Sequence, residues 1–141
     1  MQSQSRHRNA ASGYLRIRNE SLTQQSSPQE LILLVYESLV DRLIKCQGYL
    51  AQAEGAEFDR EILKSMQLIQ YGLRDSLSFD LGGEVAVSLD HTYATWMMAL
   101  EFLNTSRSAE RLSNLLVGVR EVHDAWKIAF AAPGGGKSES A

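Results

Sequence analysis

Four long segments of this chain repeat their apolar residues with the period of an α-helix, and only short breaks separate them. The segments cover residues 28–54, 59–78, 84–104 and 108–130. Connections of about four to five residues between long helices force neighbouring helices to run antiparallel. No stretch alternates apolar and polar residues with a period of two, so no sheet is expected. The sequence therefore predicts an all-α fold, an antiparallel up-down four-helix bundle.

Residues at the ends of the segments carry helix start and stop signals. Ser27 and Glu30 have the spacing of a capping box, and Pro28 stands at the first helical position, where an N–H has no partner in any case. Gly55 is expected to end the first helix. The glycines at 82–83 are expected to shape the turn before the third helix.

The composition of the two ends sets the domain boundaries. Residues 1–12 are polar and low in bulky side chains, so they are predicted to be disordered. Residues 133–141 begin at a proline and continue with three glycines, which predicts a flexible tail. Residues 13–132 are then one domain, the bundle with a short N-terminal arm. A chain of 141 residues has room for one such core.

One apolar face of each predicted helix is assigned to the core. The inward residues are expected to be Ile32, Val35, Tyr36, Leu39, Leu43, Cys46 and Leu50, then Ile62, Met66, Ile69, Leu73 and Leu77, then Val85, Ala86, Leu89, Tyr93, Trp96, Met97, Leu100 and Leu103, and finally Leu112, Leu115, Val119, Val122, Trp126 and Phe130. Cys46 is the only cysteine, which excludes an intramolecular disulfide, and it is expected to be a small core residue.

The third helix has a second apolar face, which a bundle helix does not need. Apolar residues also lie away from the core face on the first two helices. The outward residues are expected to be Leu31 and Leu34, then Leu68, Tyr71 and Phe79, and on the third helix Val87, Ala94, Met98 and Phe102. Soluble monomers seldom expose large apolar patches, so these residues indicate a partner surface, with a groove between the second and third helices. The alternatives are a helix buried on all sides and a permanent homo-oligomer.

Composition argues against several kinds of partner. With 14 basic and 17 acidic side chains the net charge is −3, and no basic face suited to nucleic acid is apparent. Membrane insertion is not expected, because no apolar run approaches the roughly 18 residues of a membrane span. The single cysteine suits a reducing cytosol.

Catalytic and metal-binding patterns in the sequence are weak. The Glu-x-x-His pairs of helical-bundle metal enzymes do not occur, and Glu121 and His123 are two residues apart, so they lie on different faces of a helix. His91 has no second ligand at metal-binding spacing. Residues 134–138 resemble the end of a phosphate-binding loop, but Ala131 stands where that motif needs its first glycine. We expect no catalytic residue, no metal and no cofactor.

Four blocks of residues, in order and with matching spacing, resemble a known family. The blocks are Tyr14, Ser27-Pro28-Gln29-Glu30-Leu31-Ile32-Leu33 with Tyr36-Glu37, Gly82-Gly83-Glu84-Val85-Ala86 with Leu89, Tyr93 and Met97, and Asp124-Ala125-Trp126-Lys127. From about Tyr14 to Trp126 the chain resembles the flagellar secretion chaperones of the FliS family. Thr92, Trp96 and Cys46 depart from the residues usual in that family, which could alter which client is preferred.

The resemblance implies a function that fits the apolar outer faces. Members of the family bind the disordered C-terminal segment of flagellin in the bacterial cytoplasm and keep it from polymerising before export. In several members the arm before the first helix covers part of the groove; here Tyr14 and Ile17 would do so, unless they are permanent core. The expected partner is flagellin, held by a monomer or weak homodimer. An adaptor for another flagellar or regulatory protein remains the alternative, beside the structural homo-oligomer.

Overall fold

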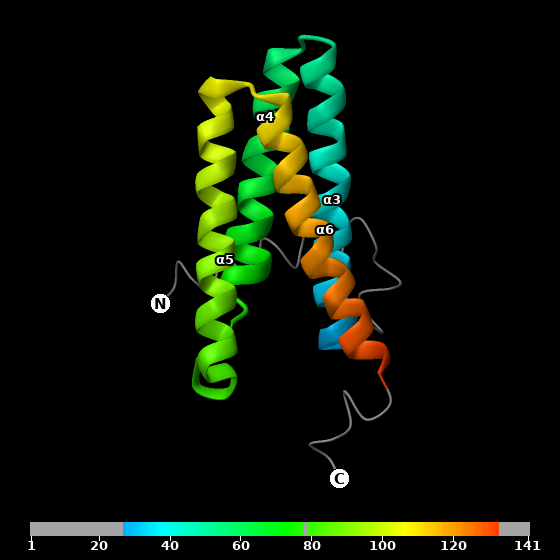
Figure 1. The fold of residues 1–141 in the computed structure, drawn as a ribbon, viewed down its shortest axis with the longest axis vertical. Helices are drawn as coiled ribbons and strands as arrows, with labels where there is room; N and C mark the ends of the chain where they lie inside the picture. Colours follow the sequence, from blue (N-terminus) through cyan, green and yellow to red (C-terminus); the bar gives the residue numbers. More distant parts are fainter. Residues whose placement is uncertain (1–26, 78, 133–141) are drawn as a thin grey trace.

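The computed structural model describes residues 27–77 and 79–132, with residues 79–81 described in their backbone only. The chain forms the helices α3 (Pro28–Ala51), α4 (Gly55–Gln67), η1 (Leu68–Arg74), α5 (Phe79–Ser106) and α6 (Ala109–Ala131). The π-helix η1 continues directly from α4, so the two form one rod. The four rods run alternately up and down (Figure 1), which confirms the predicted all-α bundle.

The start of α3 is the predicted capping box. The Ser27 hydroxyl accepts a hydrogen bond from the Glu30 backbone N–H at 3.2 Å, and the Glu30 carboxylate accepts one from the Ser27 N–H at 2.8 Å. The prediction for Gly55 is wrong, because this glycine begins α4 and does not end α3. The chain reverses earlier, at residues 52–54, where Ala53 takes the left-handed conformation with φ of 56°.

The connection before α5 is shorter than the sequence predicts. Helical backbone already begins at Phe79, and only Gly83 interrupts it, with φ of 52° and ψ of −125°. A residue with a Cβ atom rarely adopts that conformation, so the glycine permits the kink. The prediction that this glycine shapes the entry into the third helix is confirmed.

The core follows the predicted seams closely. Tyr36, Leu39, Leu43, Ile62, Ile69, Leu100, Leu103, Leu112 and Val119 are all fully buried. Val85 is an error of the prediction, since 63% of its surface is exposed. The reason is its position just after the kink, where the first turns of α5 extend past the end of η1 (Figure 1). Neighbouring Ala86 is buried there in its place.

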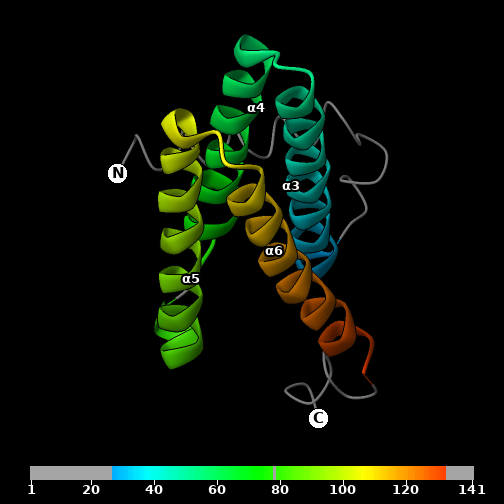
Figure 2. The ribbon, with the colours of Figure 1, turned by 45° about the horizontal axis from the view of Figure 1, so that its top comes forward.

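The helices are not equally close to one another. Helix α6 meets α5 at their shared connection and then leans away from it across α3 (Figure 2). Ser108 begins α6, its hydroxyl accepting from the Arg111 N–H at 3.1 Å. The side of α5 that borders α6 is therefore covered less along its length than the side that packs on α4 and η1.

Candidate protein-binding surface

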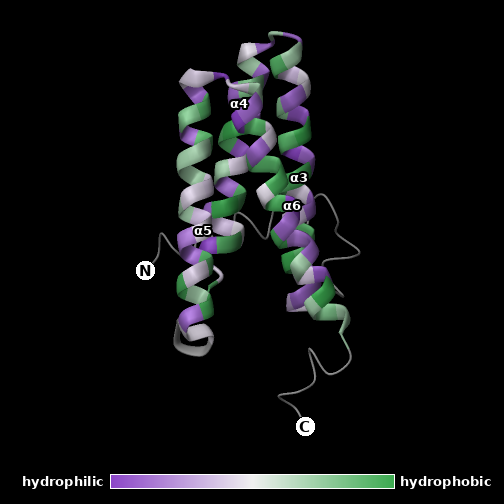
Figure 3. Ribbon diagram, viewed as in Figure 1, coloured by the Kyte–Doolittle hydropathy of each residue, from purple (hydrophilic) through white to green (hydrophobic). Residues whose placement is uncertain are grey.

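The exposed apolar side chains of α5 lie on the face opposite its core seam. Val87, Met98 and Phe102 are 59%, 71% and 47% exposed, and Ala94 between them is half-buried. We call these four residues the α5 stripe. Their spacing of seven, four and four residues places them on one side of an α-helix. The middle of α5 is accordingly mostly pale or green in Figure 3, with few hydrophilic residues.

Arg111 of α6 marks one end of the α5 stripe. Its guanidinium carbon lies 4.5 Å from the centroid of the Phe102 ring, in cation–π geometry. The stripe therefore borders α6 at this end. The surface that could receive a partner runs along the outer face of α5, opposite its core seam, and meets α6 at Phe102.

Leu68 does not belong to an outer surface. It is 5% exposed and packs in the core, which corrects the expectation that it points outward. The cause lies in α4, where Glu61 and Ser65 are buried beside Ile62, so the core face of this rod is wider than its apolar residues indicate. Leu68 is three residues after Ser65 and seven after Glu61, which places it on that face. Leu34 is also corrected, because it is partly buried against the core. Without Leu68, Tyr71 is the expected groove residue of the second helix whose side chain the structure describes.

The remaining predicted residues divide between half-buried and undescribed positions. Leu31 and Tyr71 are half-buried. Tyr14 and Ile17 lie outside the described residues, and so does the side chain of Phe79. The other large apolar residues that are exposed are Val85 at the start of α5, Ile44 on α3, Leu63 on α4, and Val117 and Ile128 on α6. Only α5 collects several large ones on the face of the predicted stripe.

A hydrogen-bonded cluster inside the bundle joins three helices. The hydroxyls of Tyr36 on α3 and Tyr93 on α5 are 2.6 Å apart, and Trp126 of α6 donates its Nε1–H to the Tyr36 oxygen at 3.2 Å. Trp96 meets the Tyr36 ring edge-on. Burial raises the pKa of both tyrosines, so both remain neutral hydroxyls. The sequence placed these residues in the core but gave no sign of their hydrogen bonds.

His123 is stacked on this cluster. Its ring lies 5.7 Å from that of Tyr36 at an interplanar angle of 10°, and only 8% of the residue is exposed. Its Nε2 atom is buried without a hydrogen-bond partner among the described residues. Burial is the main cause that lowers the His123 pKa, Lys127 adds to it, and Glu37 and Asp124 oppose it.

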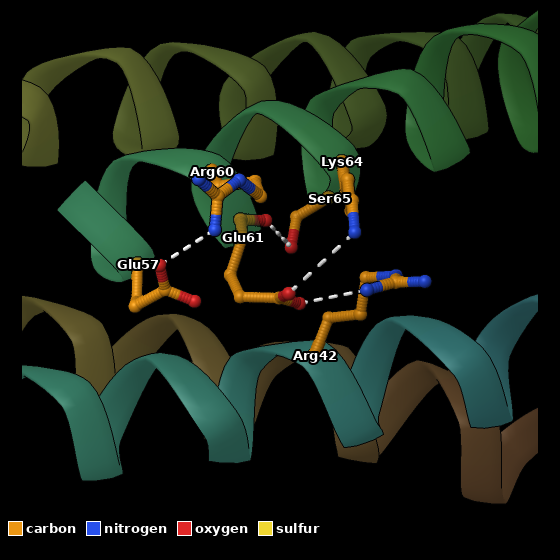
Figure 4. Close-up of polar contacts among 6 residues, drawn as sticks. All are labelled: Arg42, Glu57, Arg60, Glu61, Lys64 and Ser65. Atoms are coloured by element: carbon orange, nitrogen blue, oxygen red, sulfur yellow. Dashed lines mark hydrogen bonds and ion pairs between the residues drawn. The ribbon is translucent and has the colours of Figure 1, made fainter.

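A buried ion pair that was not predicted joins α3 and α4. The Arg42 Nη1 atom lies 2.7 Å from the Glu61 Oε1 atom, with both side chains 9% exposed (Figure 4). Both residues stand at core spacing, next to Leu43 and Ile62, which was the available signal. Phe58, 1% exposed, was also missed, although it lies four residues before Ile62.

The cysteine and the possible metal ligands can be examined in the described residues. Cys46 is fully buried as expected, and burial followed by the nearby Glu61 carboxylate raises its pKa to about 12. The thiolate needed by a nucleophile is therefore scarce at neutral pH. In the part of the chain that the structure describes, no three His, Cys, Asp or Glu side chains cluster as metal ligands would. None of the described helices combines the length and apolarity needed to cross a membrane.

Comparison with known proteins identifies relatives over most of the chain. The family model described as "Flagellar protein FliS" matches residues 10–133. The flagellar secretion chaperone FliS of Salmonella typhimurium is 24% identical over 114 residues, covering 81% of this chain and 84% of the relative. The flagellar secretion chaperone FliSB of Pseudomonas aeruginosa is 28% identical over 113 residues, covering 80% and 89%.

A solved structure shares the fold. It is described as a crystal structure of a flagellar chaperone from bacteria, and it superposes with a TM-score of 0.69 at 15% sequence identity. The match covers 86% of this chain and 97% of the other.

Proposed function

The chain belongs to the family of the flagellar protein FliS, and on that premise we propose that it is a cytoplasmic export chaperone for flagellin. In this proposal the disordered C-terminal segment of flagellin folds as an amphipathic helix onto the α5 stripe. The observation that carries the proposal is the exposure of Val87, Met98 and Phe102 on one face of a helix whose opposite face already fills the core.

The apolar area of the stripe is enough to contribute useful affinity. Full burial of a large apolar side chain contributes about 1.5–3 kcal/mol, and Met98 and Phe102 start from 71% and 47% exposure. Part of this gain offsets the ordering of a disordered segment. A helix docking in a groove or on a helical face is a common form of peptide recognition.

The proposed mechanism is stoichiometric protection. A client segment covered by the chaperone is unavailable to other flagellin subunits, and the complex separates when the export apparatus competes for the client. No covalent step is needed, because mass action alone sets the free concentration of the segment.

The test is calorimetry with a peptide of the C-terminal segment of flagellin from the same bacterium. Wild-type protein should bind it with a negative change in heat capacity. The double variant Met98→Ser/Phe102→Ser should bind about 30-fold more weakly, corresponding to about 2 kcal/mol of lost apolar contact. Far-ultraviolet circular dichroism and thermal melting should show an unchanged fold.

A matched control separates this site from general loss of apolar surface. Leu63 on α4 and Ile128 on α6 are 56% and 71% exposed and lie off the stripe. The variant Leu63→Ser/Ile128→Ser should therefore bind the peptide as the wild type does. Equal loss of affinity in both double variants would refute the assignment of the stripe, and unfolding of the first would show that its residues belong to the core.

A homo-oligomer would use the same stripe. Sedimentation of the protein without peptide distinguishes the two, since the chaperone should sediment as a monomer or weak dimer, whereas a permanent oligomer should keep its mass on dilution. An adaptor for another flagellar protein would bind that protein in preference to the flagellin peptide.

A further inference from the structure

Among the described residues, two arginines lie over phenylalanine rings. The first of these arrangements also includes a carboxylate. The Arg107 guanidinium lies 4.7 Å from the centroid of Phe58, and its Nη1 atom is 2.9 Å from the Asp59 Oδ1 atom. Cation, aromatic ring and carboxylate all come from the chain itself. Phe58 is only 1% exposed, so this arrangement is closed to a partner.

The second arrangement lacks its carboxylate. Arg111 lies 4.5 Å from the centroid of Phe102, but it forms no ion pair within residues 27–77 and 79–132. Glu110, its neighbour in sequence, does not pair with it in the described part of the chain either. A guanidinium has five N–H donors, and an aromatic face leaves the donors at its edge available. Phe102 is 47% exposed, so this arrangement is open to a partner.

We propose that Arg111 binds an acidic side chain of the amphipathic helix that docks on the α5 stripe, which completes at Phe102 the cation, ring and carboxylate arrangement seen at Phe58. This inference rests on the proposed function, because it takes the stripe as the docking surface. The partner helix then carries an aspartate or glutamate three or four residues from the apolar residue that covers Phe102, since that spacing keeps both on one face.

The geometry favours an arginine for this task. The ring of Phe102 holds the planar guanidinium in place before the partner arrives, so less side-chain freedom is lost on binding. Docking of apolar residues on Phe102 and Met98 removes water from the neighbourhood, which strengthens the attraction between guanidinium and carboxylate. The apolar stripe would supply affinity, and Arg111 would select which segment binds and in which register.

The experiment is calorimetry with the flagellin C-terminal peptide and two arginine variants. Arg111→Gln should weaken binding about three- to tenfold, the range between an exposed and a well-formed charged hydrogen bond. Arg120→Gln is the matched control, because Arg120 is also exposed on α6 and has no ion pair in the described part of the chain. It removes the same charge and should change affinity less than about twofold.

Changes in the peptide identify the carboxylate. Each aspartate and glutamate of the peptide is replaced in turn by asparagine or glutamine. One of these replacements should weaken binding to the wild-type protein as much as Arg111→Gln weakens binding of the unchanged peptide. The same replacement should cause no further loss of affinity when it is tested against the Arg111→Gln variant. A peptide with an amidated C-terminus should bind unchanged, because the proposed group is a side chain.

The outcomes separate this inference from the function on which it rests. Peptide binding that weakens equally in both arginine variants overturns the role of Arg111 and leaves the stripe as the docking surface. If only amidation of the peptide C-terminus reproduces the loss of affinity seen with Arg111→Gln, then Arg111 binds the terminal carboxylate, and the assignment to a side chain is overturned. If the wild type binds no peptide while remaining folded, the proposed function itself fails.

Discussion

At the scale of single residues, the buried ion pair between α3 and α4 costs hydration free energy and fixes how the two helices pack. Arg42 and Glu61 lose most of their hydration, which their attraction over 2.7 Å offsets in part. Lys64 adds a second, more distant cation, 3.9 Å from the Glu61 Oε2 atom (Figure 4). The pair fixes the position of α4 along α3, because a shift of one residue would separate the charges.

Glu61→Gln should destabilise the fold by about 3 kcal/mol, because it removes the carboxylate that balances the buried Arg42 guanidinium. Urea unfolding followed by circular dichroism measures the change. Glu57→Gln is the control, since it removes an ion pair with Arg60 whose side chains are 44% and 55% exposed. That loss should stay below about 1 kcal/mol. Equal unfolding midpoints for the two variants would contradict the assigned role of Glu61.

His123 makes stability depend on pH in a defined direction. Its pKa is lowered in the folded protein, mainly by burial, so the unfolded chain binds a proton more readily. The stabilisation that the neutral His123 ring contributes is fully present above its pKa in the unfolded chain, which is about 6.5. This stabilisation is lost as the pH falls through the lower pKa of the folded protein. The free energy of unfolding should therefore be smaller at about pH 5.5 than at about pH 7.5, and His123→Gln should reduce this difference. His91→Gln, at an exposed position, should leave it unchanged.

At the scale of elements, periodicity predicted helices well and their irregularities poorly. Seams such as Leu39, Leu43 and Leu100, Leu103 follow from the α-helical period. Leu68 lies on the core face because Glu61 and Ser65 are buried there, and polar residues at those positions give no sign of burial in a single sequence. Gly55 was misread because glycine suits both the end of one helix and the start of the next, and the left-handed residue was Ala53.

Gly72 shows what η1 requires at its contact with α3. A Cβ atom at this position would lie 3.0 Å from the Cγ1 atom of Val35, a side chain that is itself 4% exposed. Gly72→Ala should destabilise the fold by about 1 kcal/mol, since overpacking outweighs the better helix propensity of alanine. At Gly48 nothing lies within 4 Å of the added atom, so Gly48→Ala should stabilise it by about 0.5–1 kcal/mol. Thermal unfolding of both variants shows whether each substitution raises or lowers the stability of the fold. If Gly72→Ala is stabilising, the Val35 side chain can move to make room for the added Cβ atom.

At the scale of the whole molecule, the sequence predicted the number and direction of the rods but not their relative closeness. Short connections imply antiparallel neighbours, whatever the packing angles. The lean of α6 across α3 depends on contacts between residues far apart in sequence, such as Trp126 with Tyr36. These hydrogen bonds join three helices. The periodicity of one helix does not show which residues of another helix it will contact. The same limit explains why the contact of Arg111 on α6 with Phe102 on α5 was not predicted.

The division of α5 into two faces then links folding to binding. Tyr93, Trp96, Leu100 and Leu103 are at most 6% exposed and fill the core from one side. The bundle is closed by these residues, so Met98 and Phe102 on the other side add little to the stability of a single chain. Apolar residues that a fold does not need for its own stability carry a risk of aggregation in solution. A partner that covers the stripe removes that risk, which is the reason to attribute these side chains to binding and the buried ones to folding.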